Sequence, residues 1–223
     1  MRTIRPLEHV RRVYCAGPLF SEIERRQMSH LAEVLSAAGF EPFVPHADGM
    51  EFAQLHPYLI AEGHDPVQAG KWVHEAVFAL DIYQVVLGCG SLVFNLNGRV
   101  PDEGAVSEAA IAWTLGKPLV IYKDDIRTAV AGRDNPLVIG LAEFEYTQSV
   151  DLVPEMLERK IATHPCPQQW QVPCPPHLDR ALRAGERFWS QLETFGTERP
   201  LAPLAELVLE LFGPERELAE SAR

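Results

Sequence analysis

The chain of 223 residues lacks the marks of membrane, secreted and nucleic-acid-binding proteins. It contains no apolar run near the roughly 20 residues of a membrane span, and its basic first residues lead into no apolar stretch of signal-peptide length. We therefore expect a cytoplasmic protein. The formal net charge is -11, and no cluster of Lys and Arg offsets it. That balance argues against nucleic acid and anionic membrane as partners.

Cysteine is scarce, and the four that are present are too few and too irregularly spaced for a disulfide scaffold. We expect reduced thiols. Two of them belong to the string His164, Cys166, Cys174 and His177, which could in principle bind zinc. Its HxCx7CxxH spacing fits no standard zinc finger, and incidental Cys and His are common in Pro-rich connectors. We therefore expect no metal site at this string.

The chain does contain an alternation of short apolar segments with segments of helical periodicity. The apolar segments have no polar face, which is typical of parallel strands covered by helices on both sides. The alternation predicts an α/β fold with a parallel sheet between two helical layers. We expect strands at Val13–Ala16, Glu41–Pro45, Ser91–Leu96 and Pro118–Tyr122, helices at Ser21–Ala38, Lys71–Leu87 and Gly104–Leu115, and a long loop at His46–Gly70.

The pattern changes beyond about Glu145, where helical segments surround the Pro-rich stretch HPCPQQWQVPCPPH. The predicted organisation is an α/β domain at residues 1–150 and a helical C-terminal extension with this Pro-rich connector at residues 151–223. No catalytic role is assigned to the extension. Its predicted helices are Val150–Ile161, His177–Phe195 and Leu201–Phe212.

Glu108 is the only charge in the predicted helix GAVSEAAIAWTL, which has apolar or small residues on every side. A buried carboxylate is desolvated, so it needs partners, a cleft or a raised pKa. The structural alternative is an ion pair with an Arg across a helix interface. We favour a functional role because the helix begins where a parallel strand ends, and open α/β sheets bind ligands at that edge.

Further acids lie near this helix and on the helix before it. Asp102 and Glu103 precede Glu108. A purely structural explanation is that Asp102 is the N-cap of the helix and that Glu103 interacts favourably with the helix dipole. Asp102 and Glu108 could also line one crevice, and two acids near one substrate suggest glycosyl transfer or hydrolysis. Asp81 is the lone charge near the end of another apolar helix, where the alternative is exposure on a narrow polar stripe with Gln84.

The first strand and its turn contribute a phenol, a tight backbone and a hydroxyl. Tyr14 lies in the strand, and the turn from Gly17 to Ser21 starts the next helix. This is also the ordinary start of a strand-helix unit, in which Tyr14 is core. We consider Tyr14 a candidate site residue because it lies at the same predicted sheet edge as Glu108.

Together these segments resemble the nucleoside 2-deoxyribosyltransferase family. The resemblance covers roughly residues 13 to 145 and rests on YCAGPLFSEIE, on NLNGRVPDEGAVSEAAIAW and on DNPLVIG. AGPLFS paired with PDEG, and a glutamate four residues after that glycine, is a specific combination. The resemblance implies a doubly wound, flavodoxin-like α/β fold.

The resemblance also implies roles for individual residues. Glu108 matches the nucleophile that forms a covalent deoxyribosyl intermediate, and Tyr14 matches the tyrosine that orients it. Asp102 matches the aspartate that contacts the sugar hydroxyls, and Asp81 matches a proposed proton donor to the base. Asn135 matches an asparagine that reaches the sugar from a neighbouring subunit, so a homo-oligomer with a shared active site is expected.

Other substrate contacts are less well defined. Gly17, Phe20 and Asn97 lie in the matching motifs and are candidates for substrate binding. His46 and Asp48, in PHADG, are candidates for contacts with the base. Cys89-Gly90-Ser91 replaces an aspartate that many members carry, so the base pocket does not transfer residue by residue.

The predicted function is therefore a nucleoside 2-deoxyribosyltransferase acting on a deoxynucleoside and a free nucleobase, without metal or other cofactor. One alternative is an N-glycoside hydrolase of deoxynucleosides or their 5′-monophosphates, and another is a non-catalytic nucleotide-sensing module. A related branch that hydrolyses monophosphates tends to carry a phosphate-binding serine where this chain has Asp102. A carboxylate there repels a phosphate but accepts hydrogen bonds from a free sugar hydroxyl, which favours nucleosides.

Overall fold

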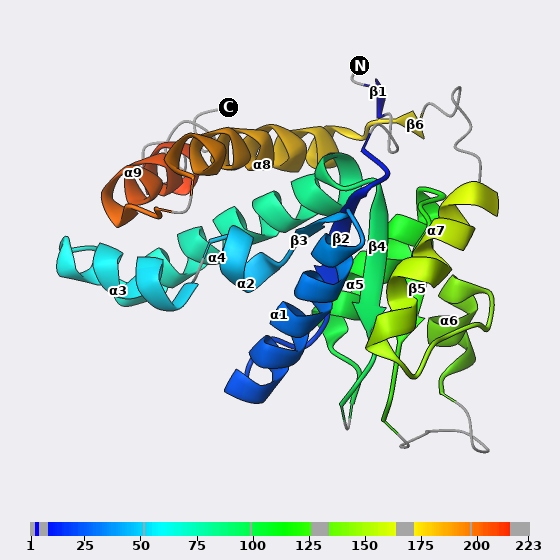
Figure 1. Cartoon of the computed structure of the whole chain (residues 1–223). Helices are drawn as coiled ribbons and strands as arrows, with labels where there is room; N and C mark the ends of the chain where they lie inside the picture. Colours follow the sequence, from blue (N-terminus) through cyan, green and yellow to red (C-terminus); the bar gives the residue numbers. More distant parts are fainter. Residues whose placement is uncertain are drawn as a thin grey trace. The chain divides into compact units, whose positions relative to one another are not determined.

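The computed structural model of the chain describes residues 3–4, 9–50, 52–98, 100–125, 134–163, 172–196 and 198–214 (Figure 1). The chain forms two compact units. We call Met1–Asp48 with Gln84–Pro173 the α/β unit, and Gly49–Tyr83 with Cys174–Arg223 the helical unit.

The α/β unit is built on a four-stranded parallel sheet, as predicted. All five residues of its SLVFN strand are buried, which explains why that strand shows no polar alternation. Tyr14 is the Cα partner of Phe43 on one side and of Leu92 on the other. In spatial order the strands are β3 (Glu41–Phe43), β2 (Arg12–Ala16), β4 (Ser91–Asn95) and β5 (Leu119–Tyr122).

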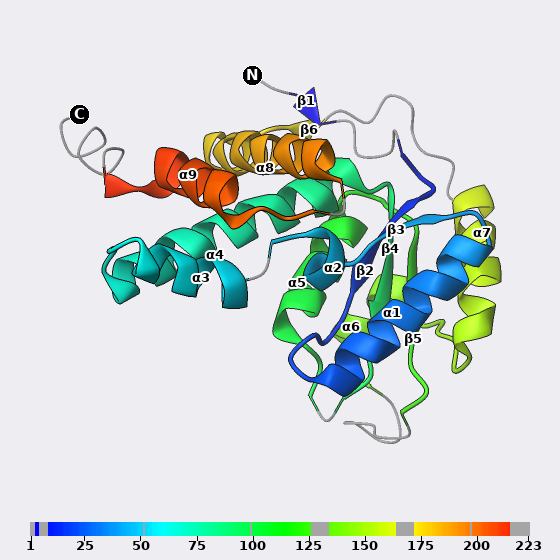
Figure 2. The same cartoon turned by 60° about the vertical axis from the view of Figure 1, so that its left-hand side comes forward.

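Helices cover both faces of this sheet, which confirms the predicted α/β architecture (Figure 2). On one face α1 (Glu22–Ala37) and α7 (Val153–Thr163) pack against side chains of β2, β4 and β5. On the other face α5 (Glu103–Thr114) contacts the same three strands. The sheet is thus buried on both sides, as a doubly wound fold requires.

Short elements complete the α/β unit. β1 (Thr3–Ile4) pairs antiparallel with β6 (Val172–Pro173), and neither strand was expected from the sequence. Thr147 forms an isolated parallel bridge with Tyr122 at the β5 edge. The remaining elements are α2 (Pro45–Asp48), the π-helix η1 (Gln84–Gly88), α6 (Pro136–Ile139) and the 3-10 helices η2 (Gly140–Ala142) and η3 (Val150–Leu152).

In the described residues of the helical unit, four helices pack around an apolar core. Its buried side chains include Leu55, Leu59, Trp72 and Phe188. Leu55 and Leu59 are one helical turn apart, so both reach this core from the same face. The helices are α3 (Phe52–Ala61), α4 (Pro66–Tyr83), α8 (Pro176–Phe195) and α9 (Leu201–Phe212).

The prediction of a long loop at His46–Gly70 is wrong. The segment contains most of α2, all of α3 and the first turn of α4. Its mixed polarity and Pro57, which lies inside α3, hid the helical pattern. Burial of one apolar face in a tertiary core stabilises a helix that local propensity does not predict.

The compact units do not follow the expected boundary at residue 150. α7 belongs to the α/β unit, and α3 and α4 belong with α8 and α9 to the helical unit. Whether residues 1–150 and 151–223 behave as separate domains stays a prediction. Among the described residues, no helix combines the length and apolar character needed to span a bilayer.

Candidate active site

The candidate site lies at the carboxyl ends of β2 and β4. From β2 the chain crosses through α1 to β3 on one side, and from β4 it crosses through α5 to β5 on the other. The crossovers therefore diverge between β2 and β4, and ligands bind at such switch points in open α/β sheets. Tyr14 of β2 and Glu108 of α5 come from the two sides of this point.

A short hydrogen bond joins these two predicted catalytic residues. The hydroxyl of Tyr14 donates to Oε1 of Glu108 at 2.7 Å, although the residues are 94 positions apart. Tyr14 is fully buried in the sheet, while Glu108 is partly exposed. The described geometry thus gives Glu108 a tyrosine partner, not the Arg partner of the structural alternative.

Glu108 has a perturbed acidity. Burial raises the pKa of its carboxyl to about 7, the hydrogen bond from Tyr14 lowers it, and the negative charge of Asp102 raises it. At neutral pH the carboxyl is therefore present in both protonation states. A group poised in this way can act as a nucleophile or exchange a proton.

Asp102 has the N-cap role considered for it, and its place in a substrate crevice stays a prediction. Its Oδ1 accepts a hydrogen bond from the backbone N–H of Ala105 at 2.7 Å, so it is the N-cap of α5. Its charge also acts on Glu108 from the start of the same helix. Glu103 is exposed in the first turn, where an acid complements the helix dipole.

The turn after β2 is closely packed at Gly17 and open at Phe20. A β-carbon on Gly17 would lie 2.8 Å from Sδ of Met28 and 2.9 Å from Cβ of Asn95, so only glycine fits without a shift. Phe20 is 85% exposed. Contact of either residue with a substrate stays a prediction.

Asn97 joins the loops that follow β4 and β5. Its Oδ1 accepts hydrogen bonds from the backbone N–H groups of Asp124 and Asp125, at 3.1 Å each. In return Oδ2 of Asp125 accepts from the N–H of Gly98 at 3.3 Å. These bonds give Asn97 a structural role, and substrate binding by it remains a prediction.

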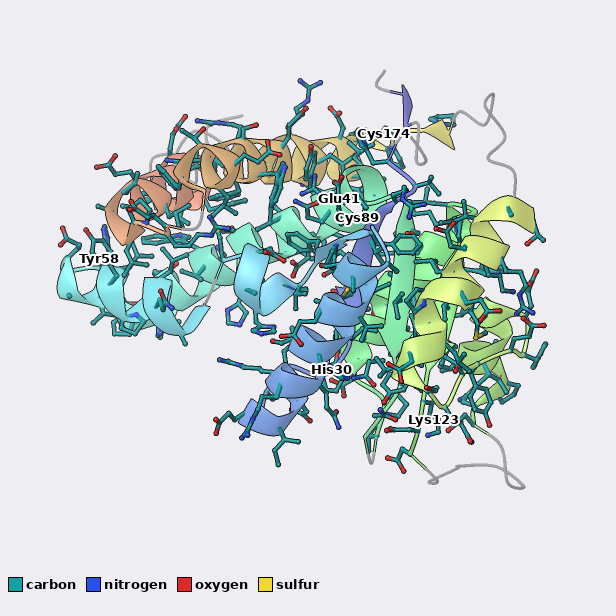
Figure 3. All side chains as sticks on the ribbon, in the orientation of Figure 1. His30, Glu41, Tyr58, Cys89, Lys123 and Cys174 are labelled. Carbon is teal, nitrogen blue, oxygen red and sulfur yellow. The ribbon has the colours of Figure 1, made fainter. Side chains whose placement is uncertain are left out.

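The exit of β5 carries polar residues that the sequence interpretation missed. The hydroxyl of Tyr122 donates to Oδ2 of Asp124 at 2.9 Å, and burial together with this carboxylate raises the pKa of Tyr122 to about 12. Lys123, labelled in Figure 3, is buried and forms an ion pair with Asp134 at 3.3 Å. The sequence feature that could have identified these residues is an apolar strand followed directly by Lys-Asp-Asp.

Asn135 follows this ion pair directly. Its Oδ1 accepts a hydrogen bond from the N–H of Leu137 at 2.9 Å, which makes it the N-cap of α6. Asn135 and Leu137 are both exposed. The expected contact of Asn135 with the sugar in a neighbouring subunit stays a prediction.

The two candidates for base contacts lie in α2. Oδ2 of Asp48 accepts from the N–H of Val44 at 2.7 Å, so this carboxylate holds the start of α2. His46 lies in the first turn of α2 and is partly exposed. Contact with a base is untested for both.

Asp81 and part of the Cys/His string belong to the helical unit. Asp81 lies on α4 in the helical unit and is partly exposed, and its role stays a prediction. Cys174 is buried and His177 is exposed in the same unit, while His164 and Cys166 lie outside the described residues. Within the described part of the chain, no three His, Cys, Asp or Glu residues are grouped in a way that could hold a metal ion.

Comparison with known proteins adds a family to this geometry. Residues 13–156 match the family model described as nucleoside 2-deoxyribosyltransferase. None of the curated proteins matches the chain. The matched span includes Tyr14, Asp102, Glu108 and Asn135.

Two solved structures are similar to parts of the chain. A conserved protein from Enterococcus faecalis V583 is 19% identical, with a TM-score of 0.47, over 67% of this chain and 98% of that chain. A 2-deoxyribosyltransferase from Bacillus psychrosaccharolyticus is 16% identical, with a TM-score of 0.43, over 64% of this chain and 90% of that chain. At these values neither similarity identifies an activity for this chain.

Proposed function

Because the chain belongs to the nucleoside 2-deoxyribosyltransferase family, we propose that it transfers a 2-deoxyribosyl group between nucleobases through a covalent intermediate on Glu108. The observation that carries this proposal is the 2.7 Å hydrogen bond from Tyr14 to Glu108 at the carboxyl edge of the sheet. It supplies a desolvated carboxylate with a group that orients it and favours its ionised form.

The proposed reaction has two displacements. A carboxylate oxygen of Glu108 forms a bond to the anomeric carbon as the bond to the base nitrogen breaks, and the base leaves with the electron pair and a proton. The second base then attacks the same carbon through a ring nitrogen, gives its N–H proton to the acid that protonated the first base, and releases the carboxylate. Two inversions give net retention of configuration. A 2-deoxy sugar lacks the electron-withdrawing 2′-hydroxyl, so its oxocarbenium-like transition state is comparatively accessible.

The other site residues have proposed roles in the same reaction. Asp102 accepts hydrogen bonds from a free sugar hydroxyl, Asp81 protonates the leaving base, and Asn135 acts in the site of a neighbouring copy. The carboxylate of Asp102 supports nucleosides over 5′-monophosphates as substrates, because it repels a phosphate group. A homo-oligomer is part of this proposal.

Product analysis tests the transfer. We would incubate the protein with deoxyinosine or thymidine, with and without adenine, and separate the products by chromatography. Deoxyadenosine formed only in the presence of adenine is the expected result. Equal release of free base in both mixtures would indicate a hydrolase, and no turnover of deoxynucleosides or their monophosphates would exclude both enzymes.

Two acids in the same helix provide a matched pair of variants. Glu108→Gln should lower transfer by more than roughly three orders of magnitude, because an amide cannot replace the nucleophile. Glu103→Gln changes an exposed acid in the first turn of α5 and should leave transfer nearly unchanged. Full activity of Glu108→Gln would overturn the proposed mechanism and leave the family membership intact.

A further inference from the structure

Phe43 is the last residue of β3 and is buried, with 1% of its surface exposed. Its Cα partner across the parallel pair is Tyr14 on β2. The two rings are stacked, with centroids 5.5 Å apart and planes 29° apart. This distance lies in the range of favourable aromatic pairs.

The ring of Tyr14 decides where its hydroxyl lies. The backbone of β2 is held on both sides, by pairing with β3 and with β4. The freedom that remains is rotation about the two side-chain torsions, and a packed ring restricts both. Phe43 covers one side of the phenol, while the hydroxyl at its far end meets Glu108.

We propose that Phe43 is a positioning residue for the proposed reaction: its ring holds the Tyr14 side chain in the orientation that brings the hydroxyl to Glu108. This inference rests on the proposed function only for its kinetic consequence. The contact itself concerns three side chains of the α/β unit, one each from β3, β2 and α5.

The backbone around Phe43 is also fixed. Val44 follows it directly, and the N–H of Val44 donates to Oδ2 of Asp48 at 2.7 Å. Asp48 therefore holds the turn that leaves β3. Phe43 is thus held by strand pairing before it and by a side-chain cap after it, so its ring is a fixed support for Tyr14.

Phe43→Leu tests the proposal, since leucine stays apolar but removes the flat ring contact. The Tyr14 hydroxyl should then spend less time at Glu108. That hydrogen bond lowers the pKa of Glu108, so its loss should move the acidic limb of the kcat/KM profile to higher pH. We expect kcat/KM at neutral pH to fall roughly two- to tenfold, the range that corresponds to one aromatic pair.

Phe40→Leu is the matched control. Phe40 is a buried phenylalanine just before β3, but it packs on the other side, with Val13, Cys15 and the α1 core. The Phe40→Leu variant should lower thermal stability about as much as Phe43→Leu does. It should leave the acidic limb of the kcat/KM profile in place. A shift of the same size in Phe40→Leu would show that Phe43 acts only as core.

A double-mutant cycle separates positioning from general packing. In a Tyr14→Phe background the hydroxyl is absent, so Phe43→Leu should cause no further shift of the limb. An undiminished shift in that background would overturn the proposal.

A carbon-13 NMR titration of the Glu108 carboxyl gives a readout that needs no turnover. It should show a higher pKa in Phe43→Leu than in wild type, and an unchanged pKa would overturn the proposal. If the wild type turns over no deoxynucleoside, the proposed function fails, while this titration still decides the role of Phe43.

Discussion

At the scale of single residues, the pKa of the Glu108 carboxyl is set by effects of opposite sign. Burial and the charge of Asp102 raise its pKa, the hydrogen bond from Tyr14 lowers it, and the balance is about 7. A nucleophile must be ionised, so kcat/KM should rise with pH through a limb near this value. This places the reaction under the control of a group that titrates near neutral pH.

Asp102→Asn should move this limb to lower pH. Asparagine keeps an oxygen that can accept from Ala105, so the N-cap of α5 is retained while the negative charge beside Glu108 is removed. The measurement is the pH dependence of kcat/KM for a deoxynucleoside and a free base. A limb that stays in place would mean that the charge of Asp102 does not reach Glu108. A higher KM in this variant is expected as well, because the proposed sugar contact weakens.

Glu108→Gln should make the protein more stable at pH 8 and leave its stability near pH 4.5 almost unchanged. The raised pKa means that the folded state loses stability from this carboxyl as pH rises from about 4.5 to about 7. Each pKa unit corresponds to about 1.4 kcal/mol, so the gain at pH 8 should be on the order of 2–3 kcal/mol. Urea unfolding at both pH values measures it, with the exposed Glu103→Gln as control. Equal effects at both values would argue against the raised pKa.

At the scale of elements, two helical glycines in the helical unit should respond to alanine with opposite signs. In α8 a β-carbon on Gly185 would overlap the carbonyl oxygen of Ala79 and the Cβ of Tyr83, both on α4. In α4 a β-carbon on Gly70 would meet nothing nearer than Nε2 of His56 at 3.5 Å. The close approach of α4 and α8 therefore depends on glycine at one position only.

Gly185→Ala should destabilise the protein by about 1–3 kcal/mol, the usual cost of overpacking. Gly70→Ala should stabilise it by about 0.5–1 kcal/mol, because alanine loses less conformational entropy in a helix. Thermal unfolding followed by circular dichroism compares the two. No loss of stability in Gly185→Ala would contradict the packing of α4 against α8. A loss of stability in Gly70→Ala would contradict the open space beside Gly70.

At the scale of the whole molecule, a buried lysine makes stability depend on pH. Lys117 is 4% exposed, and its Nζ donates to the carbonyl oxygens of Val86, at 3.1 Å, and Cys89. Burial lowers its pKa from 10.5 to about 7. Between these values the unfolded chain binds a proton that the folded protein does not, so the free energy of unfolding should rise with pH.

Between pH 7 and 8.5 this rise should be roughly 1–2 kcal/mol, and it should be absent in Lys117→Met. Glu108, with a pKa of about 7, completes its titration at the lower end of this window and opposes the trend there only slightly. The buried thiols of Cys15 and Cys89 have raised pKa values and oppose the trend only above about pH 9. Urea unfolding at constant ionic strength measures the slope, with Lys71→Met as an exposed control. If the free energy of unfolding rises with pH as steeply in Lys117→Met as in the wild type, the lowered pKa of Lys117 is not the cause of the rise.

The sequence by itself determined the parallel strands, the helices that flank them, and the lone acid Glu108. These are local patterns: an apolar run without a polar face, or a single charge in an apolar helix, is readable without knowing what packs against it. The family resemblance, confirmed over residues 13–156, also followed from local motifs. The N-cap role of Asp102 was readable for the same reason.

Only the tertiary structure decided which distant groups meet. The hydrogen bond from Tyr14 to Glu108 joins residues that are 94 positions apart in the sequence. It depends on strand pairing and on the packing of α5 against β2. The ion pair of Lys123 with Asp134 is likewise absent from any local pattern. α3 was read as loop because its stability comes from a core shared with α9, far along the chain. Contacts of this kind depend on register and burial, which a one-dimensional pattern does not contain.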